Sequence, residues 1–144
     1  MTDWRAERGS ATVEVVFLMV LVLLPLLYLV GSLGRLQAGA YAASAAAREA
    51  GRAYVTAVDV EAAAARGMAA ADLVLAAHGF GPGQGSVAVA CESSPCLAPG
   101  GRVIVEAVVQ VPVPLVPDFM SGLVPTTVTM TSRHAEPVDR FREG

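Results

Sequence analysis

The feature that most constrains this chain is a long uncharged apolar stretch near its N-terminus. From Val15 to Gly34 the sequence is VVFLMVLVLLPLLYLVGSLG, which contains no acidic or basic residue. In a helix, which rises about 1.5 Å per residue, this stretch measures roughly 30 Å, the thickness of the hydrocarbon core of a bilayer. Pro25 is compatible with this prediction because a membrane-embedded helix tolerates a kink. The stretch therefore predicts a membrane-inserting helix.

Two fates are open for this segment. A cleaved secretory signal has a short basic start, here Arg5 and Arg8, and small residues after its apolar core, here Ala38-Gly39-Ala40. A retained span is favoured, because the apolar run exceeds the ~7–15 residues of an ordinary signal core. The composition beyond Gly34 also remains helical. The charges on the two flanks are mixed, so the positive-inside rule does not orient the span.

The overall charge excludes one class of partner. The chain of 144 residues has a formal net charge of -3, and all ten of its basic residues are arginine. Binding to a nucleic-acid backbone depends on neutralising phosphates with basic side chains. We therefore predict no contact with nucleic acid.

The residues just before the span form the most specific motif. Arg8-Gly9-Ser10-Ala11-Thr12-Val13-Glu14 combines a basic residue, a glycine, small residues and one acid at the membrane edge. This motif resembles the processing site of type IV prepilins, in which a peptidase cuts after glycine and the mature chain has Glu as its fifth residue. Over about residues 5 to 55, including Ala47-Arg48-Glu49-Ala50, the chain resembles TadE-like proteins of actinobacterial type. These are minor pilins or pseudopilins of tight-adherence (Tad) pilus systems, and the tail from His134 to Arg142 is also similar to that group.

The resemblance implies a domain organisation and a function. It implies a prepilin-type leader over 1–9, cut between Gly9 and Ser10 by prepilin peptidase, and a membrane-spanning, extended helix over 10–55. A helix-plus-sheet domain over 56–144 would then lie outside a single-pass membrane anchor whose N-terminus is cytoplasmic. The implied role is assembly of a pilus or secretion apparatus with pilin subunits and other envelope proteins, without catalysis or a cofactor. The alternative is a secreted binding domain, released by signal peptidase near Tyr41.

Two residues of the motif have simpler explanations as well. Glu14 serves assembly in the resemblance, but at the edge of the span it is also compatible with a solvated position in the headgroup layer. Ser10 is compatible with an N-cap of the helix, because its hydroxyl can accept from a backbone amide of the first turn.

Beyond the span the sequence predicts an α+β domain. Thr56 is expected to cap a second alanine-rich helix over about 59–77, and the glycine-rich segment Gly79–Gly85 is expected to be a hinge. This segment is not a phosphate loop, since no Lys-Ser/Thr pair follows it.

Alternation with period two then predicts three strands of an antiparallel sheet, over 86–91, 102–111 and 126–133, with one face packed on the second helix. Prolines 112, 114 and 117 end the middle strand. They begin a connection with an apolar patch that is compatible with a membrane, a partner or the edge of the sheet: Leu115, Val116, Phe119 and Met120.

The two cysteines predict a disulfide. Cys91 and Cys96 lie at the turn between the first two expected strands, and such a pair oxidises outside the cytoplasm. A metal site would need His78 and His134 to converge with the cysteines, and the sequence shows no ligand pair at zinc-like spacing. No nucleophile elbow, metal-binding helix or paired-acid motif is present, so we predict neither an enzyme nor a metal site.

Overall fold

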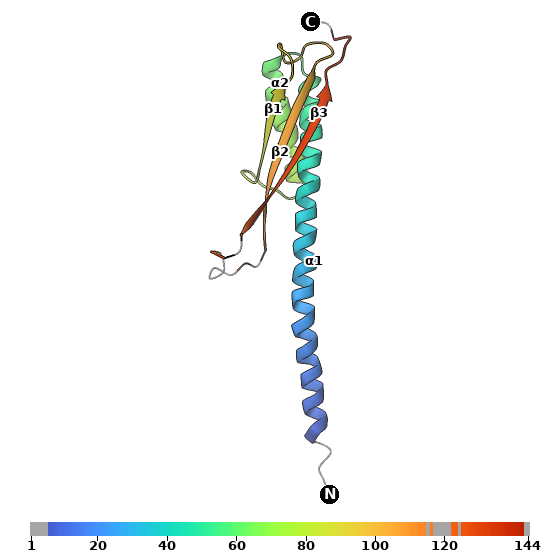
Figure 1. Cartoon of the computed structure of the whole chain (residues 1–144), viewed down its shortest axis with the longest axis vertical. Helices are drawn as coiled ribbons and strands as arrows, with labels where there is room; N and C mark the ends of the chain where they lie inside the picture. The colour runs from blue at the N-terminus through green and yellow to red at the C-terminus, as the bar shows by residue number, and fades with distance from the viewer. Residues whose placement is uncertain (1–5, 115, 117–121, 124, 143–144) are drawn as a thin grey trace. The chain divides into compact units, whose positions relative to one another are not determined.

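The computed structural model describes residues 6–114, 116, 122–123 and 125–142, with side chains from Ala11 onward. The elements follow in the order α1 (Ala6–Val55), α2 (Val60–Ala77), β1 (Gly85–Cys91), β2 (Arg102–Pro112) and β3 (Thr127–Pro137) (Figure 1). The chain divides into two compact units, Met1–Gly34 and Arg35–Gly144. This layout of two helices and an antiparallel sheet confirms the predicted α+β class.

In the first unit, α1 is a single apolar helix. It continues without a break past Pro25. Every residue from Ala11 to Val30 is exposed. Among the residues of this unit whose side chains are described, the apolar side chains of the helix therefore have no packing partner.

In the second unit, the rest of α1 forms one wall of the core. Most of its buried residues are small, and Tyr54 is the one large side chain among them: Gly39, Ala42, Ala43, Ala46, Ala47, Ala50, Gly51 and Tyr54. Their spacing of one, three or four positions places them on one side of the helix. Alanine has the highest helix propensity and the shortest apolar side chain, so this part of α1 is stable as a helix and admits close neighbours.

The turn after α1 differs from the sequence prediction. Thr56 does not cap α2; its hydroxyl donates back to the carbonyl of Arg52 at 2.8 Å. Asp59 is the N-cap, and its carboxylate accepts from the amide of Ala62 at 2.7 Å. Asp and Thr are both good N-caps, so the sequence alone did not decide between them.

The end of α2 is fixed by a glycine in the left-handed conformation. Gly79 has a φ of 78°. The amide of Phe80 donates to the carbonyl of Leu75 at 2.9 Å, and that of Gly79 donates to Ala76 at 3.0 Å. This is a Schellman motif, in which the residue after the glycine packs back on the helix. Phe80 and Leu75 are accordingly both buried.

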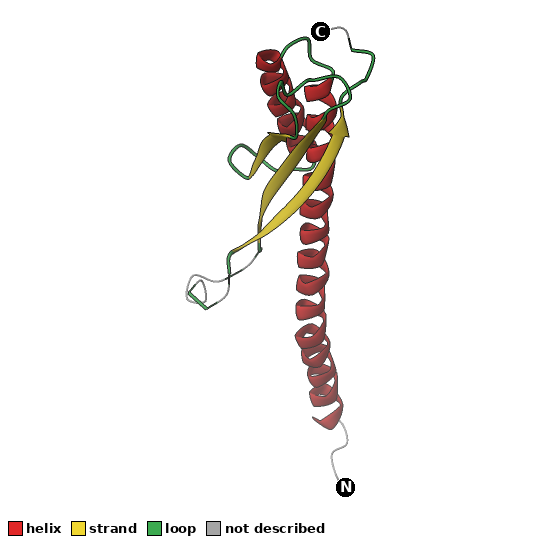
Figure 2. Ribbon diagram, turned by 45° about the horizontal axis from the view of Figure 1, so that its top comes forward, coloured by secondary structure: helices red, strands yellow, loops and turns green. Residues whose placement is uncertain are grey.

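The sheet has the order β1-β2-β3, and both pairs of strands are antiparallel (Figure 2). Alternate residues of β2 are buried, as the period-two pattern predicts: Val103, Val105, Ala107, Val109 and Val111. β3 extends beyond the predicted end at Arg133, because its pairing with β2 continues to Pro137 opposite Arg102. The additional inward residues, His134 and Glu136, are polar and did not continue the apolar alternation.

The sheet packs on α1 as well as on the predicted second helix. A Cβ on Gly39 would overlap the side chain of Val111, and one on Gly51 would lie 3.5 Å from Val105. α2 contacts the sheet at β1, where a Cβ on Gly85 would lie 2.6 Å from Leu75. The prediction named only α2 because the alanines of α1 did not mark a buried face in so alanine-rich a sequence.

Candidate functional site

The first candidate site is the exposed apolar part of α1. Its large side chains are strongly exposed, including Phe17 at 66% and Leu27 at 65%. By length and composition this helix can cross a membrane. No residue in its most apolar segment is buried. Exposed apolar surface of this extent is typical of sites that contact lipid or other apolar surfaces.

The predicted processing and assembly residues lie on this helix. The backbone of Gly9 and Ser10 is helical, since α1 begins at Ala6. Ser10 is therefore not the N-cap of α1 in the full chain, contrary to that expectation. Glu14 is exposed, one residue before the uncharged stretch. An acid here faces whatever surrounds the helix, which is the position an intermolecular ion pair requires.

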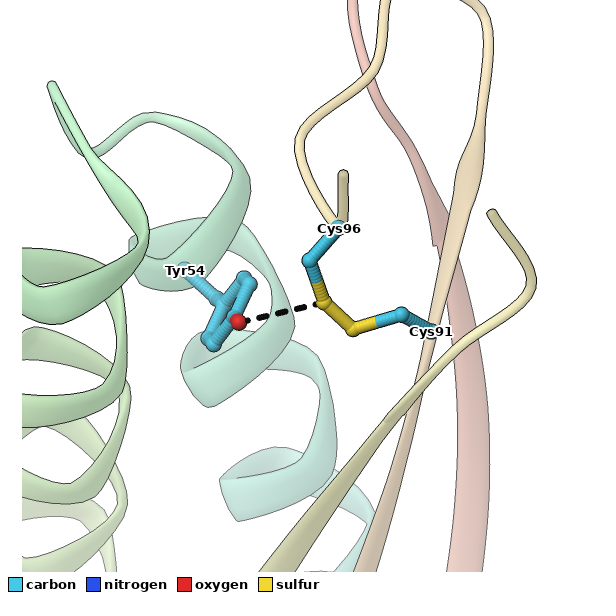
Figure 3. The surroundings of a disulfide bond; sticks show 3 residues. All are labelled: Tyr54, Cys91 and Cys96. Atoms are coloured by element: carbon cyan, nitrogen blue, oxygen red, sulfur yellow. Dashed lines mark hydrogen bonds between the residues drawn. A yellow bond between two sulfur atoms is a disulfide. The ribbon is translucent and has the colours of Figure 1, made fainter. Parts of the chain in front are cut away.

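The second candidate site is the cysteine pair. Cys91 ends β1 and Cys96 lies in the connection to β2, and the structure joins them in a disulfide with their Cα atoms 5.2 Å apart. This distance is within the range that disulfides require. The hydroxyl of Tyr54, near the end of α1, donates to Sγ of Cys96 at 3.3 Å (Figure 3). The Tyr54 hydroxyl thus links the disulfide, and with it the β1–β2 connection, to α1. The sequence did not predict this role for Tyr54.

A cation at the start of the second unit was also missed. Arg35 donates to the carbonyl of Gly79 at 3.3 Å. Its guanidinium carbon lies 4.8 Å from the centroid of the Phe80 ring, a cation–π geometry. Arg35 therefore holds the segment that follows α2 against α1. The Gly79–Gly85 segment, which was predicted to be a hinge, is therefore anchored at its first two residues.

A second arginine binds the C-terminal end of α1. Arg142 donates to the carbonyls of Val55 at 2.9 Å, of Val58 at 2.7 Å, and of Ala57. The last carbonyls of a helix lack intrahelical partners, and a cation there is favourable. Arg142 lies in the C-terminal tail, and its partners lie more than 80 positions away in the sequence.

The histidines do not converge with the cysteines. His78 is the exposed C-cap of α2. His134 lies within β3, where its Nε2 is 2.9 Å from a carboxylate oxygen of Glu136. Within the described ranges, no three His, Cys, Asp or Glu side chains are grouped so as to hold a metal ion.

The predicted apolar patch between β2 and β3 lies mostly outside the described residues. Of its four members only Val116 is described, and it is half-buried.

Comparisons of the chain with protein-family models, with curated proteins and with solved structures found no match.

Proposed function

We propose that this chain is a membrane-anchored minor pilin or pseudopilin of a Tad-type pilus or secretion apparatus, acting in assembly and not in catalysis. The observation that carries the proposal is the exposed apolar stretch of α1 with Glu14 at its edge. A helix of this kind needs a bilayer before assembly and apolar partner helices after it. The motif around Gly9 supplies the reason to choose a pilin over a simple membrane anchor.

The packing of α1 supports retention of the helix over release of a secreted domain. A chain starting near Tyr41 would lack Arg35 and its contacts with Gly79 and Phe80. It would also lack Gly39, which packs against Val111 and Met130. Signal-peptidase cleavage there would therefore remove part of the folded domain's own packing.

Glu14 has a specific role in this proposal. After cleavage behind Gly9, Ser10 would carry a free α-amino group. In a poorly solvated layer, the carboxylate of Glu14 on one subunit attracts the Ser10 ammonium of its neighbour. Prepilin peptidase, pilin subunits and other envelope assembly proteins are the partners that this role requires.

The test is replacement of Glu14 by alanine. We expect Glu14→Ala to insert and to be trimmed normally, but to be recovered with its partners at a several-fold lower yield, because the carboxylate that attracts the neighbouring Ser10 ammonium is lost. The measurement is crosslinking in native membranes followed by quantification of the complex. Val13→Ala is the matched control, since Val13 is the adjacent exposed residue, at 70%. Recovery of both variants at wild-type yield would show that Glu14 is only an interfacial residue.

A further inference from the structure

Few charged side chains lie at one end of the second unit, among the residues that the structure describes. At this end, Arg35 contacts Gly79, so α2 ends beside the first residues of this part of α1. Gly39 packs against Val111 and Met130, which brings the end of β2 and the start of β3 to the same level. β1 also begins here, because Gly85 pairs with Val109. Figure 1 shows α2 running back along α1 toward this end, which we call the Arg35 end.

The sequence keeps charge away from the Arg35 end in each of these chain segments. No acidic residue, lysine or arginine occurs in 36–47, 73–91, 107–114 or 125–132. The described charged side chains near this end are Arg35 and Asp72, and His78 is exposed there. The other charged residues that the structure describes in this unit belong to segments toward the opposite end: Arg48, Glu49, Arg52, Asp59, Glu61, Arg66, Glu92, Arg102, Glu106, Arg133, Glu136, Asp139, Arg140 and Arg142. Asp118 and Glu143 lie outside the described residues.

We propose that the Arg35 end rests on the headgroup layer of the membrane, with the Gly79–Gly85 segment as its contact surface and a zwitterionic phospholipid as its ligand. This inference rests on the proposed membrane anchoring. Arg35 follows Gly34, the last residue of the uncharged stretch, so in a bilayer it lies within the interfacial layer, which is roughly 5–7 Å thick. Gly79 and Phe80, which contact Arg35 directly, then lie in or beside the interfacial layer. A charge-poor surface is suited to that position, because charged groups there would have to be partly desolvated.

The exposed residues at this end fit an interfacial position. Tyr41 is 70% exposed and Leu73 is 74% exposed, and tyrosine is enriched where membranes meet water. Gly81, Pro82 and Gly83 are exposed as well. Arg35 already has partners in Gly79 and Phe80. The contact therefore does not depend on anionic lipid.

The contact surface also contains a hollow that can admit part of a lipid. It has a volume of about 530 Å³ and lies between the second half of α2 and the Gly79–Gly85 segment. Its walls include Leu73, Ala76, Phe80 and Pro82, with Asp72 as the charged member. An acid on a mainly apolar wall favours the ammonium group of a zwitterionic headgroup over an anionic one.

The test uses the full chain in phosphatidylcholine vesicles, with single added cysteines that carry a fluorophore. Cys91 and Cys96 are bridged, so the added thiol is labelled alone. The sites are Pro82→Cys at the proposed contact, Leu73→Cys as a second site on α2, and Leu23→Cys within the apolar stretch. Val58→Cys is the matched control, because Val58 is apolar and 87% exposed but lies at the opposite end of α2. Quenching is measured with nitroxide on the lipid headgroup or in the middle of the acyl chain.

We expect the headgroup nitroxide to quench the probe at Pro82 several-fold more strongly than the probe at Val58, with Leu73 between them. The mid-chain nitroxide should quench Leu23, and replacing a third of the lipid by phosphatidylglycerol should not increase the signal at Pro82. Quenching at Leu23 with none at Pro82 or Leu73 would overturn this inference alone. Crosslinking of Pro82 to a second protein chain, with lipid excluded, would overturn it in favour of a protein interface. Absence of quenching at Leu23 would overturn the membrane anchoring itself.

Discussion

At the scale of single residues, glycine sets how closely the sheet approaches α1. Gly39 is buried, and a Cβ there would overlap Val111 and lie 3.5 Å from Met130. We expect Gly39→Ala to lower the free energy of unfolding of the second unit by about 1–3 kcal/mol, the usual cost of overpacking a core. Pulse proteolysis of the full chain in urea measures this change. Gly34→Ala is the matched control, because nothing lies within 4 Å of its Cβ position. Equal stability of the two variants would contradict the packing of β2 on α1.

Arg142 stabilises the end of α1 from the C-terminal tail. Its guanidinium donates to the carbonyls of Val55, Ala57 and Val58. Arg142→Ala should lower the free energy of unfolding by about 1–3 kcal/mol, since several carbonyls lose a charged donor. Arg140→Ala removes the same charge from an exposed side chain for which no hydrogen bond is found among the described residues, and should change stability by less than about 0.5 kcal/mol. If both variants unfold at the same urea concentration, the contacts of Arg142 do not contribute to stability.

At the scale of elements, the disulfide and Tyr54 join the β1–β2 connection to α1. Replacing both cysteines by serine should lower the free energy of unfolding by roughly 2 kcal/mol in the chain-entropy model, while insertion of the apolar helix is unchanged. Tyr54→Phe should cost about 0.5–1.5 kcal/mol, and less when both cysteines are replaced by alanine, because alanine offers the hydroxyl no acceptor in place of the sulfur. Equal costs in the two backgrounds would show that Tyr54 does not act through Cys96.

The same cysteines report the compartment of the second unit. Outside the cytoplasm the pair is oxidised, so alkylation of intact membranes should label neither thiol before reduction and both afterwards. Labelling before reduction would place this part of the chain on the reducing side. The charges that flank the span did not settle this orientation, so the redox state is an independent measure of it.

Most elements followed from the sequence, because each carries a local signal. The uncharged stretch predicted the exposed part of α1, and the alternation Val103, Val105, Ala107 predicted the buried face of β2. The end of β3 was missed because His134 and Glu136 face inward with polar side chains. Thr56 was predicted as the N-cap of α2 in place of Asp59 because both residue types cap helices.

The contacts between distant segments had no local signal. Arg35 meets Gly79 across 44 positions, and Arg142 meets Val55 across 87. Arginine is usually solvated at a surface, so nothing in the sequence distinguished these two from the others. Gly39 and Gly51 were also indistinguishable from the other glycines until the sheet was placed against them. The cysteine pair was predictable because its members are only 5 positions apart.

At the scale of the whole molecule, an exposed apolar helix leads into a folded unit whose described charges are concentrated away from Arg35. In this account the helix is first a membrane anchor and then a packing surface for other subunits. The proposed cleavage behind Gly9 connects the two roles, because it creates the free amino group that Glu14 of a neighbouring subunit would bind.

The most direct test of this account is the mass of the mature protein. We predict that the chain extracted from native membranes begins at Ser10, with Glu14 as its fifth residue, and that Gly9→Val leaves the leader attached because a branched side chain obstructs the scissile position. Intact-mass spectrometry, combined with sequencing of the N-terminal peptide, distinguishes these forms. A mature chain that begins near Tyr41, or normal trimming of the Gly9→Val variant, would contradict the pilin-like account.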